Sequence, residues 1–138
     1  MAQGARLGSV VMFVQGLDRS VSFYTDLLGL EVADRSATAA LLISDEGSQL
    51  ILRAMGSNAA HALGSVGVQY VIWAVSSKED LDRAERVLRE HSAYRDTRST
   101  GGLAAVEGRD PDDITVMITH PGPDQAPSRE LPLRIYGW

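Results

Sequence analysis

The sequence repeats one pattern of secondary structure twice, and this internal duplication constrains the fold more than any other feature. In each half, a β-branched strand precedes an amphipathic helix, and three short strands follow the helix. Leu17–Ser20 in the first half aligns with Leu81–Ala84 in the second, and Val14 aligns with Val75. We therefore predict an α+β fold made of two tandem βαβββ modules.

The elements of the first half are predicted from their residue types and from the glycines between them. Its helix follows Gly16, with Asp18 as the expected N-cap, and ends at Gly29, which favours the left-handed conformation of a C-terminal cap. Asp45-Glu46-Gly47 is typical of a hairpin turn. The predicted strands are Ser9–Val14, Leu30–Val32, Ala39–Ile43 and Gln49–Arg53.

The second half shows the same order with its own start and stop signals. Ser76 and Glu79 have the spacing of a capping box at the start of its helix. In the later turn Arg109–Asp113, Pro111 suits the second position and Asp113 tolerates a left-handed backbone. The predicted strands are Tyr70–Val75, a segment around Tyr94, Leu103–Val106 and Ile114–Thr119, and the helix is expected to bury Leu81, Ala84, Val87 and Leu88.

The length of 138 residues suits a single domain with a genuine hydrophobic core. We predict that module one covers residues 7–54, that the Gly- and Ala-rich residues 55–66 form a linker, and that module two covers 67–120. Residues 121–138 are proline-rich and are expected to form an extended tail. A strap over the core or over a partner subunit is favoured for this tail, and the alternative is a pocket closed by Tyr136 and Trp138.

Composition excludes several classes of function. There are no cysteines, which excludes disulfides, thiolate catalysis and cysteine-bound zinc. The net charge is −5 without a basic stripe, so we expect no binding to nucleic acid. No apolar run reaches the roughly 18 residues of a membrane-spanning helix, and Met1–Gly8 lacks a secretory signal. A cytoplasmic location without membrane association is the resulting expectation.

The duplicated modules, the segment Gly16–Leu30 (Gly-Leu-Asp-Arg-Ser-Val-Ser-Phe-Tyr-Thr-Asp-Leu-Leu-Gly-Leu) and the Arg-Asp-Pro-Asp-Asp turn together resemble the vicinal oxygen chelate superfamily. That group includes glyoxalase I, extradiol dioxygenases, fosfomycin-resistance enzymes and bleomycin-resistance proteins. The resemblance spans Leu7 to His120. It implies that the curved mixed sheets of the two modules form a cup that binds a ligand, and that the protein is a homodimer.

Metal-using members of the superfamily place a histidine on the first strand of each module and a glutamate or another ligand on its last strand. By the resemblance, these four positions correspond to Ser9, Ile51, Tyr70 and Met117. None of them is a usual ligand of a divalent ion, and no His, Asp or Glu lies within two residues of any of them. We therefore predict no metal site, no cofactor and no catalytic residue.

The three histidines do not replace the missing ligands. His61 lies in the predicted linker, His91 near the end of the second helix, and His120 after the last strand, so each is interpreted as a surface or capping residue. An unconventional site of His61, His120 and Glu107 remains an alternative, although no ligand spacing supports it.

Strand alternation predicts which residues line the cup, because successive side chains point to opposite faces of a sheet. The fully apolar side of each strand suits packing against a helix, and the other side is expected to face the ligand. For Phe13, Ile51 and Met117, simple packing in a collapsed core is the favoured alternative. The predicted ligand-binding residues are Ser9, Phe13, Gln49, Ile51, Arg53, Tyr70, Thr115 and Met117.

Arg53 is the most informative of these residues, since a guanidinium that faces inward requires a partner. That partner is either Glu107, in a structural ion pair, or an anionic or carbonyl group of a ligand. If Arg53 faces the cup without an ion pair, a purely cationic ligand is not expected.

Three hypotheses for function follow. The first is a metal-independent small-molecule binding protein of the glyoxalase/bleomycin-resistance type that sequesters an antibiotic or an aromatic metabolite. The second is a lyase, isomerase or dioxygenase of the same superfamily, either metal-free or with displaced ligands. The third is a degenerate copy that acts through its dimer surface and tail. The sequence leaves open whether the modules pair within one chain or across a dimer.

Overall fold

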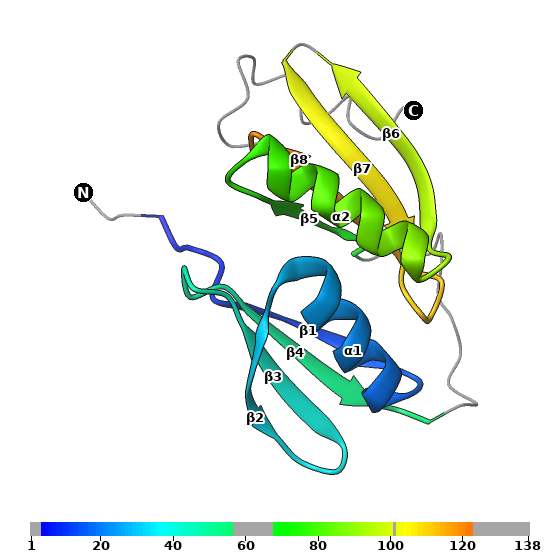
Figure 1. The fold of residues 1–138 in the computed structure, drawn as a ribbon. Coiled ribbons are helices and arrows are strands. Elements are labelled where there is room, and N and C mark those ends of the chain that lie inside the picture. Colours follow the sequence, from blue (N-terminus) through cyan, green and yellow to red (C-terminus); the bar gives the residue numbers. More distant parts are fainter. Residues whose placement is uncertain (1–3, 57–67, 101, 123–138) are drawn as a thin grey trace. The chain divides into compact units, whose positions relative to one another are not determined.

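The computed structural model describes residues 4–56, 68–100 and 102–122. The chain divides into two compact units, Met1–His61 and Ala62–Trp138. In each unit, one helix lies across one face of a four-stranded sheet (Figure 1). Most of the predicted linker, from residue 57 on, and the predicted tail from residue 123 lie outside the described residues.

The first unit contains one helix and a mixed sheet with the strand order β1-β4-β3-β2. β1 runs parallel to β4, whereas β3 is antiparallel to both β4 and β2. After β1, the chain passes through α1 and re-enters the sheet at β2, on the opposite edge. The elements are β1 (Ser9–Val14), α1 (Leu17–Leu28), β2 (Glu31–Arg35), β3 (Ala39–Ile43) and β4 (Gln49–Ala54).

The core of the first unit lies between α1 and its sheet. Leu42, Leu50 and Leu52 are fully buried, and they share one face because they pair across β3 and β4 at alternate positions. From α1, the side chains of Phe23 and Tyr24 are buried and their rings meet edge to face at 5.1 Å between centroids. Burial of this apolar face is the main force that holds the helix on the sheet.

The end of α1 agrees with the prediction, but its start does not. Gly29 ends the helix with φ 65°, and its N–H donates to the carbonyl of Thr25. The predicted N-cap Asp18 is wrong, because Gly16 occupies the cap position and provides no side-chain hydrogen bond. Asp18 lies instead within the first turn, where its carboxylate forms an ion pair with Arg35 of β2.

The second unit repeats this architecture. Its strand order is β5-β8-β7-β6, with β5 parallel to β8 and the other pairs antiparallel. The predicted duplication of two βαβββ modules in an α+β fold is therefore confirmed. The elements are β5 (Val71–Ala74), α2 (Lys78–Glu90), β6 (Tyr94–Thr100), β7 (Leu103–Arg109) and β8 (Thr115–His120).

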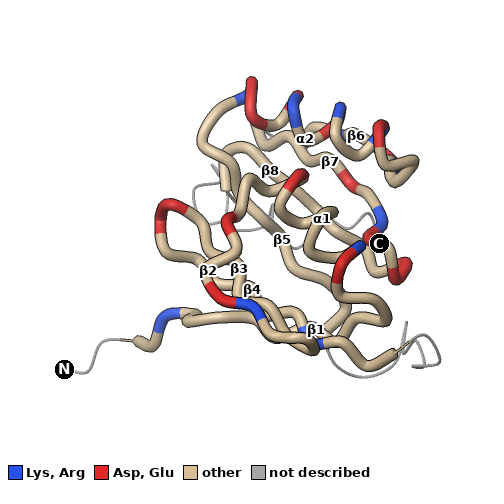
Figure 2. Tube along the Cα trace, turned by 60° about the horizontal axis from the view of Figure 1, so that its bottom comes forward, with Lys and Arg blue, Asp and Glu red and all other residues tan. Residues whose placement is uncertain are grey.

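Helix α2 buries one narrow apolar face and exposes a charged one. Leu81, Ala84, Val87 and Leu88 are buried, as predicted. Acidic and basic residues follow one another along the rest of the helix (Figure 2). Since acidic and basic residues are mixed along it, this helix presents no extended basic surface. Among the described residues, no helix is long and apolar enough to cross a membrane.

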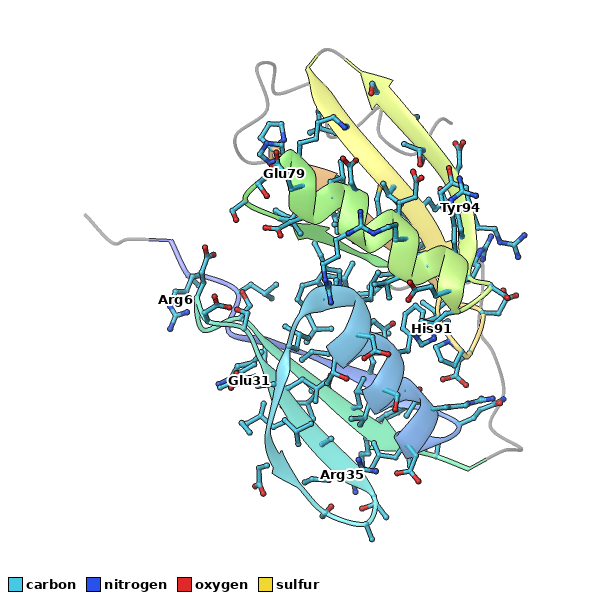
Figure 3. The ribbon with its side chains drawn as sticks, in the orientation of Figure 1. Arg6, Glu31, Arg35, Glu79, His91 and Tyr94 are labelled. Atoms are coloured by element: carbon cyan, nitrogen blue, oxygen red, sulfur yellow. The ribbon has the colours of Figure 1, made fainter. Side chains whose placement is uncertain are left out.

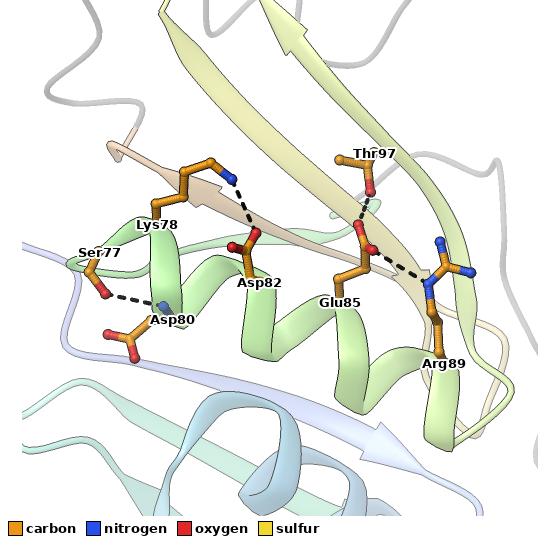
Figure 4. Close-up of polar contacts among 7 residues, drawn as sticks. All are labelled: Ser77, Lys78, Asp80, Asp82, Glu85, Arg89 and Thr97. Carbon is orange, nitrogen blue, oxygen red and sulfur yellow. Dashed lines mark hydrogen bonds and ion pairs between the residues drawn. The ribbon is translucent and has the colours of Figure 1, made fainter.

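The end of α2 is joined to β6 by side-chain contacts. Tyr94 lies at the start of β6 (Figure 3). The guanidinium carbon of Arg89 lies 3.9 Å from the centroid of its ring. Thr97 of β6 donates a hydrogen bond to Glu85 of α2, and Arg89 pairs with the same carboxylate (Figure 4). These contacts fix the register of the helix against the edge strand of its sheet.

The start of α2 corrects a second predicted cap. Ser77, and not Ser76, is the N-cap, and its hydroxyl accepts a hydrogen bond from the N–H of Asp80 at 3.1 Å (Figure 4). The capping box of Ser76 and Glu79 is therefore wrong by one residue. Two consecutive serines offer the same cap chemistry, so the sequence does not distinguish them.

The turn between β7 and β8 has the predicted conformation. Asp113 adopts φ 64°, and its N–H donates to the carbonyl of Asp110 at 2.9 Å. The carboxylate of Asp110 accepts hydrogen bonds from the N–H groups of Asp112 (2.8 Å) and Ile114 (2.9 Å). Asp110 thus satisfies backbone donors that the tight turn leaves without a strand partner.

Candidate ligand site on the open sheet faces

Each sheet has one face that its helix covers and one face opposite the helix, which we call the open face. The registers of the strands show which residues share each open face, because side chains alternate along a strand and lie side by side across paired strands. The predicted ligand-binding residues fall on these open faces in both units.

The open face of the first unit contains five of the predicted residues. On β1 it includes Ser9 and Phe13, which pair with Gln49 and Arg53 of β4, while Ile51 lies between those two residues along β4. On its other side, Ile51 pairs with the apolar residue Leu41 of β3.

This open face exposes a large apolar surface. Phe13 is 65% exposed and Val11, beside Ile51, is 56% exposed. Exposed apolar surfaces of this kind are typical of sites that bind a ligand or another protein.

Arg53 is the cation of the first open face. It is exposed, and it forms no ion pair among the described residues. The carboxylate of Glu107, which was one of its predicted partners, pairs with Arg98 of its own sheet at 3.1 Å. Phe13 is the neighbour of Arg53 across the parallel strand pair, so the two residues share this face.

The open face of the second unit contains the other three predicted residues. Thr115 and Met117 lie on β8, and Tyr70 directly precedes β5. Met117 pairs with Ile72 of β5 on one side and with Glu107 of β7 on the other. Tyr70 and Thr115 are half-buried, whereas Met117 is only 1% exposed.

An apolar cluster surrounds Met117. Leu103 and Ala105 of β7 are buried with it, and Tyr70 and Ile72 pack against this group. Of the five residues, Leu103, Ala105 and Ile72 were not among the predicted site residues. Alternation along Leu103–Val106 and along Tyr70–Val75 places them on this face, and that pattern could have identified them.

A polar cluster lies beside the apolar one. Arg98 of β6 pairs with Glu107 at 3.1 Å and with Asp96 at 3.0 Å. Arg98 is the cross-strand neighbour of Ala105, so its side chain belongs to the open face. Arg98 was not predicted as a site residue. The strand around Tyr94 was predicted without bounds, so the residues after Tyr94 could not be assigned to a face of the sheet.

The four positions that the resemblance assigns to metal ligands do not suit a divalent ion. They present a hydroxyl, an alkyl group, a phenol and a thioether, whereas such ions prefer imidazole and carboxylate ligands. Met117 is also packed among Leu103, Ala105 and Ile72. In the part of the chain that the structure describes, no three His, Asp or Glu residues form a group that could hold a metal.

The fold and these faces define a class of protein in which two βαβββ modules each present one open sheet face. Solved structures share this fold. A glyoxylase/bleomycin resistance protein/dioxygenase domain from Frankia sp. EAN1pec is 22% identical, with a TM-score of 0.73 over 85% of this chain and 98% of that one. Lactoylglutathione lyase from Agrobacterium tumefaciens is 18% identical, with a TM-score of 0.66 over 86% and 95%.

A third structure is a mutant of the fosfomycin resistance protein FosX from Listeria monocytogenes, complexed with Mn(II) and 1S,2S-dihydroxypropylphosphonic acid. It is 13% identical, with a TM-score of 0.68 over 97% of this chain and 99% of that one. No curated protein matches the chain by sequence. The model of the Glyoxalase/Bleomycin resistance protein/Dioxygenase superfamily matches residues 6–118. The chain belongs to this superfamily, as the resemblance implied.

Proposed function

We propose that this protein binds a small molecule on its open sheet faces without a metal ion, and that it sequesters an antibiotic or an aromatic metabolite. The observation that carries the proposal is the environment of Met117. At the position that the resemblance assigns to a metal-binding carboxylate, this side chain is 1% exposed and packs in an apolar cluster. A buried thioether among alkyl groups does not suit chelation, and it makes this part of the sheet face apolar.

The composition of the two faces supports the same proposal. Small-molecule sites are mostly apolar and contain a few polar groups that fix orientation. On the first open face, Phe13 and Ile51 are apolar and Gln49 is polar. On the second open face, taken by itself, Met117 is apolar and Thr115 is polar. A flat apolar molecule with one or two polar substituents fits this distribution.

The positive charge of Arg53 favours a neutral or anionic ligand over a cationic one. Because it forms no ion pair among the described residues, it is available to an anionic or carbonyl group. A purely cationic ligand would be repelled by this guanidinium. We therefore propose that the ligand is neutral or anionic.

A fluorescence titration tests the binding proposal. Trp73 of β5 and Tyr70, just before it, are half-buried, and their emission is followed while neutral and anionic aromatic compounds and glycopeptide antibiotics are added. We expect saturable changes that persist in excess EDTA. A response that requires an added metal, or the lack of a response across the panel, contradicts the proposal.

A pair of arginine variants tests the charge preference. Arg53→Gln is expected to weaken binding of anionic compounds about tenfold, since hydrogen bonds to charged groups contribute about 1.5–3 kcal/mol. Arg6→Gln is the matched control, because Arg6 is exposed and precedes β1. Equal effects of the two substitutions would mean that only the net charge matters.

An enzyme of the same superfamily is the second candidate. It is favoured by Glu107, a half-buried carboxylate on the open face beside Met117. Such a carboxylate can act as a general base in a lyase or isomerase reaction without a metal. Turnover of a bound compound that is lost in Glu107→Gln, while its binding is retained, would favour this candidate.

We also propose that the protein is a homodimer. The support is the exposed apolar face of the first unit, where Val11 and Phe13 would otherwise remain in water. Sedimentation equilibrium is expected to give twice the mass of the chain, and Phe13→Glu is expected to weaken the association. A monomeric wild-type protein would contradict the dimer and favour modules that pair within one chain.

A further inference from the structure

We infer that the hydroxyl of Thr119 is a ligand-binding group, and that the ligand places a hydroxyl or carbonyl group against it. This inference rests on the proposed function and specifies the chemistry of the ligand at the open face of the second sheet. The resulting ligand class is an apolar molecule with a hydrogen-bonding group at one end.

The first observation is that Thr119 is a buried polar residue whose hydroxyl has no partner. Its exposure is 0%, and Oγ1 forms no hydrogen bond within residues 4–56, 68–100 and 102–122. Burial of a hydroxyl without a hydrogen bond is unfavourable, and nearly all buried polar groups in native proteins have a partner. A partner supplied by a ligand explains why this position is a threonine and not a valine.

The second observation is the position of Thr119 in the sheet. It pairs with Ala74 of β5 and with Ala105 of β7, so the smallest side chains of the open face flank it. Larger side chains at these two positions would shield the hydroxyl from any group that approaches the face. Two positions earlier on the same strand, Met117 provides the apolar contact.

The third observation is the polar cluster beyond Ala105. Arg98 is the neighbour of Ala105 on the far side from Thr119, and it forms an ion pair with Glu107. Paired strands lie about 4.8 Å apart, so Thr119 and Arg98 are separated by roughly two strand spacings. A flat ring that lies over Ala105 therefore has the threonine hydroxyl at one edge and the ion pair at the other.

Ser20 provides the internal comparison. It is also fully buried, and its Oγ also has no partner in the described part of the chain. Ser20 lies on the face of α1 that packs against the first sheet, whereas Thr119 lies on an open face. Helix α1 therefore covers Ser20, whereas the helix of the second unit lies on the other side of the sheet from Thr119, and Ser20→Ala is the matched control.

The experiment measures binding of phenol and toluene, which differ by a hydroxyl in place of a methyl group. Methyl NMR spectra of Met117 and Ile72 report the second open face, and Ile51 reports the first. The ratio of the two dissociation constants is compared among the wild-type protein, Thr119→Val and Ser20→Ala. We expect Thr119→Val to shift this ratio by about 3- to 10-fold in favour of toluene, and Ser20→Ala to leave it unchanged.

Thr119→Val conserves shape, so the variant is expected to fold and to have a higher melting temperature than the wild-type protein in the absence of a probe. A lower melting temperature would reveal a structural partner of the hydroxyl and would overturn the inference. An unchanged ratio with both probes bound at Met117 would also overturn it, while leaving the proposed binding function intact. If neither probe shifts the Met117 and Ile72 methyl groups, both the inference and the proposed site are contradicted.

Discussion

At the scale of single residues, the buried hydroxyl of Ser20 lowers the stability of the first unit. Its side chain is fully buried between α1 and the first sheet, and Oγ has no hydrogen-bond partner among the described residues. The hydroxyl therefore loses its hydration on folding and gains no replacement. Alanine at this position removes the unsatisfied group and also favours the helix.

We predict that Ser20→Ala raises the free energy of unfolding by about 1 kcal/mol, measured by urea denaturation. Ser22→Ala in the same helix is the control, because Ser22 is exposed and only the difference in helix propensity applies there. A destabilised Ser20→Ala variant would show that the hydroxyl has a structural partner.

Asp113 is a second residue that lowers stability locally, through its backbone conformation. It adopts φ 64° in the turn between β7 and β8, a conformation that is easier for glycine than for a residue with a side chain. Its carboxylate contributes little, since the nearest cation, Arg95, lies 4.0 Å away and both side chains are more than half exposed.

We predict that Asp113→Gly is more stable than Asp113→Ala by about 1 kcal/mol in thermal or chemical denaturation. Both variants lose the carboxylate, so their difference isolates the backbone conformation. Equal stabilities would mean that the turn adopts a different conformation in solution.

At the scale of secondary-structure elements, the packing of α2 on its sheet depends on Gly108 of β7. A Cβ atom at this position would lie 2.5 Å from the side chain of Leu88 and 2.8 Å from the carbonyl oxygen of Ala93. The second contact is with the backbone, which cannot move without displacing the segment that joins α2 to β6. Glycine is therefore required for the close approach of helix and strand.

We predict that Gly108→Ala lowers the free energy of unfolding by about 2 kcal/mol. Gly8→Ala is the control, since a Cβ atom there would have no neighbour within 4 Å. A near-neutral Gly108→Ala variant would contradict the close packing of Leu88 on β7.

The order of the elements could be predicted from the sequence because the strand and helix periodicities are strong and occur twice. The caps were less predictable, since Ser76 and Ser77 have the same chemistry and Gly16 caps α1 without a side chain. The length of β6 was also missed, because Tyr94–Thr100 contains mainly polar residues and shows no clear apolar alternation.

At the scale of the whole molecule, duplication explains why the two units share one strand order. Alternation predicted the open-face residues of β1, β4 and β8, whereas Leu103 and Ala105 of β7 and Arg98 of β6 were not predicted. The cross-strand pairs between them, such as Arg98 with Glu107, depend on register, which a single sequence does not specify. The predicted positions of the metal ligands came from the resemblance, and none of the four residues there is a usual ligand of a divalent ion.

We propose that this superfamily member binds small molecules without chelating a metal at Ser9, Ile51, Tyr70 and Met117. The most direct test is a titration of the metal-free protein with Mn(II), followed by electron paramagnetic resonance of the free ion. We predict that the free-ion signal rises in proportion to added Mn(II), with no saturable loss. A stoichiometric loss of the free-ion signal would show that Mn(II) binds. If ligand binding then requires the bound Mn(II), or is abolished by it, the proposal is contradicted.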